Sequence, residues 1–249
     1  MPKPAQRSNE RSSAASLRGK VAVVTGGSRG IGLAIAQALR EAGCRLAVTA
    51  QFRDSKPGTT ANKFGSESLV HSCDVRDETS VANFFAAVRK RFGRVDVLVN
   101  NAGIAGPTRN VGELSLADWR DVLETNLTGM FLTTRSALPL MSGGGVIINN
   151  LSISAKGNFP GMSAYNASKH GAAGFTATLR EELREKGIRV VGLYPGATDT
   201  AIWKQFWPDA PRARMMSPAT IAQAVVYAAS TPPESTVEEL VIAPSGGEL

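Results

Sequence analysis

The strongest constraint on the fold of this chain is the alternation of short apolar runs with longer segments of helical periodicity. Runs rich in β-branched residues occupy residues 20–25, 45–49, 68–73, 95–100, 145–152, 188–194 and 239–242. Between most of them, apolar residues recur at helical spacing, at residues 31–39, 77–92, 115–141 and 163–186, whereas residues 52–67 give only a weak helical signal. Strands that alternate with helices pair in parallel through right-handed crossovers. The pattern predicts an α/β fold, in which helices cover both faces of one doubly wound parallel sheet of about seven strands.

The chain is predicted to form a single domain, residues 17–249, after a flexible polar tail, residues 1–16. Its 249 residues, 43% of them apolar, suit one large α/β domain. The tail lacks the apolar core of a signal peptide, and the longest uncharged run is broken by proline and glycine, so no membrane partner is expected. Residues 1–20 hold five cations and one acid, which accounts for +4 of the net charge of +7. The mildly basic remainder predicts no nucleic-acid partner.

Two cysteines and two histidines offer little for a metal site. His71 and Cys73 fall in a predicted strand, and Cys44 and His170 form no second pair at a ligand spacing, so core packing is favoured over metal binding. Two cysteines also cannot form a disulfide framework. The expected compartment is therefore reducing, which indicates a cytoplasmic protein.

A glycine-rich turn follows the first predicted strand. The segment TGGSRGIG, residues 25–32, places Gly26, Gly30 and Gly32 before a helix, where free N–H groups favour a phosphate. The spacing is neither the usual G-x-G-x-x-G nor an NTPase phosphate loop. In a Rossmann-like sheet, however, this turn favours dinucleotide binding over a purely structural role. Small or polar residues follow the other strands at the same edge, where ligands bind, namely Asp74-Val75, residues 100–103, Ser152 and Pro195-Gly196.

Residues 163–172, SAYNASKHGA, place Tyr165 and Lys169 one helical turn apart among small side chains. The two side chains would share a helix face. An ammonium near a phenol favours the phenolate and lowers the pKa of the tyrosine, which would make Tyr165 a candidate general acid or base. Because the same spacing is common in helices that only pack, the pair alone leaves a structural role open.

Together these motifs resemble the short-chain dehydrogenase/reductase family. The resemblance rests on TGGSRGIG, on NNAG at residues 100–103, on Ser152 thirteen residues before the Y-x-x-x-K motif, and on PG-x-x-x-T at residues 195–200, and it runs from about residue 17 to the end. It implies hydride transfer between a nicotinamide cofactor and a carbonyl or secondary alcohol. It also implies a catalytic tetrad of Asn126, Ser152, Tyr165 and Lys169.

The resemblance assigns a role to each member of this tetrad. Tyr165 would exchange a proton with the substrate oxygen, and Lys169 would lower the pKa of Tyr165 and bind the nicotinamide ribose. Ser152 would hold the carbonyl oxygen, and Asn126 would hold a water that passes the proton on. Simpler roles for Ser152 as a strand-end cap and for Asn126 as a helix-interior polar residue stay open.

The same resemblance implies a set of cofactor contacts that includes Tyr165 and Lys169. Its other members are Gly26, Ser28, Arg29, Gly30, Ile31, Gly32, Arg53, Asp74, Val75, Asn101, Ala102, Gly103, Pro195, Gly196, Thr198 and Thr200. An acid at the end of the second strand would select NAD, but Ala50 and Gln51 occupy that place. Arg29 and Arg53 suit a 2′-phosphate, so NADP(H) is predicted over NAD(H), although Arg53 in solvent and Arg29 as a cap remain alternatives.

The substrate is predicted to be a small carbonyl compound or alcohol. Phe159, Ile202, Trp203 and Phe206 are the candidate substrate contacts; the last three lie in residues 198–214, which form either a lid or packed structure. A narrower alternative is a 3-oxoacyl-[acyl carrier protein] reductase, with Lys204, Arg212 and Arg214 meeting an acidic carrier. An alternative from another class is a non-catalytic sensor of NADP(H). The resemblance also implies a homo-oligomer, a dimer or tetramer.

Overall fold

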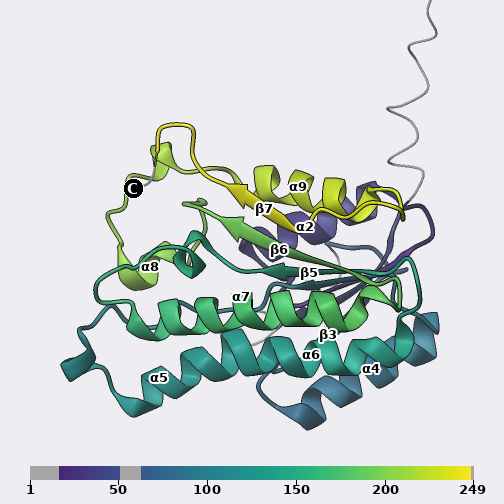
Figure 1. The fold of residues 1–249 in the computed structure, drawn as a ribbon, viewed down its shortest axis with the longest axis horizontal. Helices are drawn as coiled ribbons and strands as arrows, with labels where there is room; N and C mark the ends of the chain where they lie inside the picture. The colour runs from purple at the N-terminus through teal and green to yellow at the C-terminus, as the bar shows by residue number, and fades with distance from the viewer. Residues whose placement is uncertain (1–16, 51–62, 248–249) are drawn as a thin grey trace, which may run out of the picture.

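The computed structural model describes residues 17–50 and 63–247, without the side chains of Gln205 and Phe206. Its centre is an all-parallel sheet whose strands lie in the order β3-β2-β1-β4-β5-β6-β7 (Figure 1). The strands are β1 (Val21–Val24), β2 (Arg45–Ala50), β3 (Leu69–Ser72), β4 (Val97–Asn100), β5 (Val146–Asn150), β6 (Arg189–Pro195) and β7 (Glu239–Ile242). The predicted doubly wound α/β fold is confirmed. The predicted tail, residues 1–16, lies outside the described residues.

Helices cover both faces of the sheet, and the buried apolar residues among the described part form three clusters. On one face, α2 (Gly30–Glu41) packs against α9 (Pro218–Ser230). On the other lie α4 (Glu78–Phe92), α5 (Leu116–Leu123), α6 (Gly129–Ala137) and α7 (Ser163–Arg184) (Figure 1). Because both faces are covered, β1 and β4 are fully buried runs of apolar residues rather than alternating ones.

The predicted helix over residues 115–141 is interrupted. A π-helical turn, Glu124–Thr128, separates α5 from α6, and a 3₁₀ turn, Leu138–Leu140, follows α6. The N–H of Gly129 donates to the carbonyl of Glu124, one residue further back than in an α-helix. Such single π turns occur often at functional sites, and this one contains Asn126.

Helix α9 was not predicted from the sequence. It packs against α2, and its buried residues recur at helical spacing, at Ile221, Ala222, Val225, Ala228 and Ala229. Further apolar residues between them obscure this spacing in the sequence. Its start did carry a signal, because Ser217 accepts from the N–H of Thr220 as the N-cap and Pro218 occupies the first helical position. Of the weakly helical segment, residues 51–62 lie outside the described part, and residues 63–67 form turns.

The order of the strands places the ligand-binding edge. The chain runs outward from β1 to β3, returns to β4 and then continues outward to β7, so the switch in strand order lies between β1 and β4. In such sheets a crevice opens there, at the carboxyl ends of the strands. Thr25 and Asn101 follow these two strands, and the N–H of Asn101 donates to Thr25 Oγ1 at 2.9 Å. Among the described residues, no helix has the length and apolar character needed to cross a membrane.

Candidate active site

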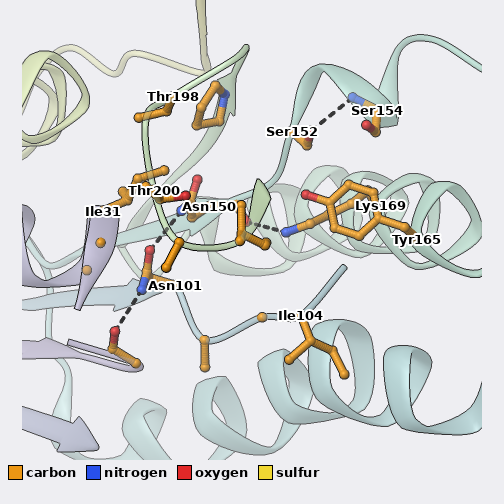
Figure 2. Close-up of a pocket in the computed structure, with 18 of the residues that line it drawn as sticks. Ile31, Asn101, Ile104, Asn150, Ser152, Ser154, Tyr165, Lys169, Thr198 and Thr200 are labelled. Carbon is orange, nitrogen blue, oxygen red and sulfur yellow. Dashed lines mark hydrogen bonds between the residues drawn. The ribbon is translucent and has the colours of Figure 1, made fainter. Parts of the chain in front are cut away.

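A cavity of about 990 Å³ lies along the carboxyl ends of the strands. Its walls include the glycine turn (residues 25–32), the loop after β4, the 3₁₀ turn Ile153–Ala155, the start of α7 and the segment after β6. Figure 2 shows that side chains from these separate segments face one space. The cavity lies at the upper end of the usual size range for ligand pockets, about 300–1,000 Å³.

The glycine turn is held to the loop after β4 by hydrogen bonds that leave no room for side chains. Asn101 Nδ2 donates to the carbonyls of Thr25 and Gly26 at 3.0 and 3.2 Å. A Cβ atom on Gly32 would lie 2.3 Å from Asn101 Nδ2 and 2.4 Å from the carbonyl oxygen of Gly26. Gly30 has φ +54°, which disfavours any residue with a side chain. The local sequence therefore requires glycine for packing as well as for its conformation.

A chain of polar contacts joins this turn to Lys169. Asn101 Nδ2 faces two carbonyls, so its Oδ1 must accept, and it does so from Asn150 Nδ2 at 2.8 Å. The main-chain carbonyl of Asn150 in turn accepts from Lys169 Nζ at 2.9 Å (Figure 2). Asn150 thus connects the predicted cofactor turn to α7, a role that its place inside β5 did not reveal from sequence.

Tyr165 and Lys169 face the cavity from the first turns of α7, as their spacing predicted. Lys169 Nζ lies 5.7 Å from the centre of the Tyr165 ring. Burial lowers the pKa of Lys169 to about 8. Burial also raises the pKa of Tyr165, against the smaller opposite effect of a hydrogen bond to Ser152. Burial therefore decides the net direction of the Tyr165 pKa shift. The predicted lowering of this pKa by Lys169 stays a prediction.

Ser152 lies just beyond β5, opposite Tyr165. Its backbone is extended, and Ser152 Oγ accepts from the N–H of Ser154 at 3.1 Å as the 3₁₀ turn begins. The side chain therefore does act as the cap that a structural role would require. Because this bond uses only an oxygen lone pair, the hydroxyl proton can still be donated, to Tyr165 or to a ligand in the cavity.

Asn126 does not line the cavity; its side chain holds neighbouring segments together. Its Oδ1 accepts from the N–H of Ile104 at 2.9 Å, and its Nδ2 donates to the carbonyl of Ile104 at 2.9 Å and to Ser168 Oγ at 3.0 Å. Ser168 lies on α7 between Tyr165 and Lys169. Both amide hydrogens are used within the chain, so the Asn126 side chain orients α7 and the loop after β4. The predicted water at Asn126 stays a prediction.

Most of the predicted cofactor residues line the cavity. They are Gly26, Ser28, Arg29, Gly30, Ile31, Gly32, Val75, Asn101, Ala102, Gly103, Tyr165, Lys169, Pro195, Gly196, Thr198 and Thr200. Asp74 does not line it, because Arg76 binds the Asp74 carboxylate and also pairs with Asp121. Arg53 and Gln51 lie outside the described residues.

The charged side chains along the cavity favour an anionic ligand. Among the described lining residues, the charged ones are Arg29, Lys63 and Lys169, and none is an acid. Arg29 is the N-cap of α2, yet it makes no side-chain capping bond, so the capping alternative is not seen. The strand β2 ends at Ala50, which is apolar and 1% exposed. Lys63 and Thr49 were not predicted, because Lys63 lies in the weakly patterned segment and Thr49 reads as an ordinary strand residue.

The predicted substrate contacts Phe159, Ile202 and Trp203 also line the cavity, whereas Phe206 belongs to α8 (Trp203–Phe206) and its side chain is not described. Trp207, which the sequence also placed in the possible lid, lines the cavity as well. Sequence reasoning missed three apolar neighbours, namely Ile104, Ile153 and Met162. Cys73 lines the cavity too, but burial raises the pKa of its thiol to about 11. Among the described residues, no group of three or more metal-ligating side chains gathers.

Comparisons with known proteins agree with this geometry. Residues 20–211 match the model of a family described as short chain dehydrogenase. Farnesol dehydrogenase of Aedes aegypti is 38% identical, with 92% of this chain and 97% of that protein covered. A human 3-oxoacyl-[acyl-carrier-protein] reductase is 39% identical, with coverages of 86% and 92%.

Solved structures are similar over the same region. A metagenomic short-chain oxidoreductase in complex with NADP superimposes with a TM-score of 0.80 at 33% identity, covering 92% of this chain and 99% of that one. A 3-ketoacyl-(acyl-carrier-protein) reductase from Brucella melitensis complexed with NADH gives a TM-score of 0.83 at 28% identity, with coverages of 92% and 98%.

Proposed function

The chain belongs to the short-chain dehydrogenase family and is an oxidoreductase that uses a nicotinamide cofactor; on that premise, we propose that it transfers hydride between NADP(H) and a carbonyl or secondary alcohol, with Tyr165 as the general acid and base. The observation that carries this proposal is the meeting of Tyr165, Lys169 and Ser152, from α7 and the end of β5, in one cavity with the glycine turn. None of these positions is close to the others in sequence except the pair on α7.

The glycine-turn end of the cavity fits a dinucleotide. The first turn of α2 opens onto the cavity and holds no acidic residue, so its N–H groups and the helix dipole favour a pyrophosphate. Arg29 supplies a guanidinium where a 2′-phosphate would need one, which supports NADP(H) over NAD(H). When bound, the cofactor supplies or accepts the hydride.

The chain's own residues manage the substrate oxygen and its proton. In the reducing direction, the Ser152 hydroxyl donates a hydrogen bond to the carbonyl oxygen. Tyr165 transfers its phenolic proton to that oxygen as hydride reaches the carbonyl carbon, which leaves an alcohol and a tyrosine phenolate. The Lys169 ammonium stabilises the phenolate until a solvent proton replaces the one transferred. The raised pKa of Tyr165 keeps it protonated at neutral pH, as an acid catalyst requires.

The test is oxidation of NADPH by the purified protein against a panel of ketones, aldehydes and β-ketoacyl thioesters. Tyr165→Phe should lower kcat about 10²- to 10⁴-fold, the usual contribution of general acid–base catalysis. Binding of NADPH, followed by fluorescence, should persist in this variant. Tyr227→Phe is the matched control, since Tyr227 is 60% exposed on α9 and does not line the cavity. Turnover that survives in Tyr165→Phe would contradict the assigned role.

Neither alternative gains support from the site. Arg212 is engaged by Asp199 and by the carbonyl of Thr200, so it is already used within the chain rather than presented to an acidic carrier. A sensor without catalysis would not require Tyr165, Ser152 and Lys169 to converge. Carrier thioesters nevertheless belong in the substrate panel, because two relatives are named 3-oxoacyl-[acyl-carrier-protein] reductases.

We also propose a homo-oligomer that buries apolar side chains on α5 and α6. Leu116 on α5 is 60% exposed, and Phe131 on α6 is 41% exposed and meets Phe175 of α7 edge to face. Exposed apolar groups on adjacent helices are typical of subunit contacts. Light scattering during size-exclusion chromatography gives the mass, and a monomer would contradict the proposal. The cytoplasmic location stays a prediction.

A further inference from the structure

The cavity beyond Tyr165 is walled mainly by apolar side chains, with Thr108 and Ser154 as polar but uncharged members. We call this part the substrate side; its walls come from residues 104–108, 153–162 and 201–207. The large side chains there are Ile104, Ile153, Phe159, Met162, Ile202 and Trp203. The charged lining residues lie elsewhere, with Arg29 in the glycine turn, Lys63 just before β3 and Lys169 at the catalytic centre. Among the described lining residues, the substrate side therefore offers no counter-ion for a charged group.

The walls of the substrate side are held in place by the main chain. Asn126 binds both the N–H and the carbonyl of Ile104. The N–H of Arg109 donates to the carbonyl of Gly161 at 2.8 Å, and Arg109 pairs with Met162 in a short parallel bridge. Residues 104–109 and residues 159–162 thus form one connected wall. An apolar surface held in this way is available to bind ligand without first rearranging.

The opposite wall is aromatic and continues to the solvent. Trp203 Nε1 donates to the carbonyl of Thr198 at 2.8 Å, so the polar atom of the indole is already used and its ring carbons remain for contact. The rings of Trp203 and Trp207 lie 6.2 Å apart at 59°. Trp207 lines the cavity and is also 41% exposed, so the apolar surface continues from the cavity to the solvent. A long hydrocarbon group would follow this path.

We propose that the substrate is an uncharged carbonyl compound or alcohol with an extended hydrocarbon portion, and that the walls of the substrate side, Trp203 and Trp207 included, select it. This inference rests on the proposed function, because it names the substrate class of the same site. A carboxylate or phosphate on the substrate would lose its hydration without gaining a counter-ion among the described lining residues there. Each methylene of a neutral chain would instead exchange water for apolar contact.

The first experiment compares matched carbonyl compounds as substrates for NADPH oxidation. For methyl ketones from butanone to decanone, kcat/KM should rise about fourfold for each methylene that becomes fully buried. Ethyl acetoacetate should exceed free acetoacetate, which carries a negative charge in place of the ethyl group, and by more than two buried carbons alone would give. A flat series, a preference for the free acid, or a strong preference for a carrier-bound thioester over its short free analogue would each overturn the substrate class.

The second experiment changes the wall. Ile202→Lys places a cation on the substrate side and should reduce or reverse the preference for the ester over the acid. Lys204→Ala is the matched control; Lys204 is exposed and does not line the cavity, so the preference should not change. Trp207→Ala should lower kcat/KM more for decanone than for butanone. An unchanged ester preference in Ile202→Lys would overturn the inference.

These outcomes separate the two levels of the proposal. If butanone and acetoacetate are both reduced but neither chain length nor charge matters, the substrate class is wrong and the proposed function stands. If the protein binds NADPH but reduces no carbonyl in the panel, the proposed function itself fails, and the substrate class with it.

Discussion

The two ends of the cavity differ in the kind of residues that form their walls. At the glycine turn the walls are main chain and small residues, joined by the bonds from Asn101 to Thr25 and Gly26 and by the bond from the N–H of Gly26 to Thr49 Oγ1. On the substrate side the walls are large apolar side chains, from loops and the short helix α8. The glycine turn leaves no space for a larger residue, whereas the shape of the substrate side depends on which side chains are present. A shared cofactor and a variable substrate require this division.

The sharpest way to test this contrast is to add one methyl group at the glycine turn. In Gly32→Ala the new Cβ would meet backbone and the Asn101 amide at less than 2.5 Å. We expect the free energy of unfolding to fall by about 3 kcal/mol, at the upper end for overpacking, and NADPH binding to be lost. Chemical denaturation and fluorescence titration measure these two effects.

Gly174→Ala is the matched control for this change. Gly174 lies within α7, and nothing lies within 4 Å of the position its Cβ would take. Alanine should stabilise the helix there by about 0.5–1 kcal/mol. If Gly32→Ala behaved like Gly174→Ala, the glycine turn would not be closely packed as described.

Between the two ends, Lys169 should be a residue that serves catalysis at the expense of stability. Its pKa in the folded chain, about 8, lies below the ordinary value of 10.5, so between these pH values the unfolded chain binds more protons and stability rises with pH. Below pH 8 Lys169 is charged in both states, so the folded chain bears the full free-energy cost of burying that charge. Lys169→Met should therefore be more stable than the wild type at pH 7, by about 1–2 kcal/mol after loss of the bond to Asn150.

The pH dependence identifies the cause of that difference. Between pH 8 and 10.5 the advantage of Lys169→Met should narrow, since the wild-type lysine can then lose its proton in the folded state. Urea denaturation of both cofactor-free proteins at several pH values measures this difference in the free energy of unfolding. A difference that is constant with pH would mean that side-chain packing, not charge, decides the stability.

At the glycine-turn end, Arg29→Ala separates recognition by charge from recognition by shape. The variant should lose about tenfold in affinity for NADPH, because a charge-assisted bond to the 2′-phosphate is removed. NADH binding serves as the internal control and should change little. Equal losses for the two cofactors would show that Arg29 supports the turn rather than selecting NADP(H).

The smallest effect on stability is expected at the outer end of the substrate side. Trp207 is 41% exposed, so Trp207→Ala should change the free energy of unfolding by about 0.5 kcal/mol or less. Thermal denaturation beside Gly32→Ala compares the two ends directly. A large loss in Trp207→Ala would show that residues 203–207 are packed structure instead of an adaptable wall.

Much of this arrangement was visible in the sequence because its signals are local. Strand runs, the glycine turn and the spacing of Tyr165 and Lys169 each depend on residues within one or two turns of chain. The π turn at Asn126 and helix α9 were missed, since the first breaks an otherwise helical pattern and the second has apolar residues outside its buried face that obscure the helical spacing. The cofactor contact predicted for Asp74 stays a prediction; Arg76 binds that carboxylate.

The sequence by itself determined the fold class and the order of elements, and it indicated which residues follow each strand, because periodicity and glycine content act over short distances. Only the tertiary structure decided how those residues bind one another. The contacts between Asn150 and Asn101, and between Asn126 and Ser168, join residues 49 and 42 positions apart. The direction of the Tyr165 pKa shift likewise depends on burial, which arises only when α7 packs against the end of β5.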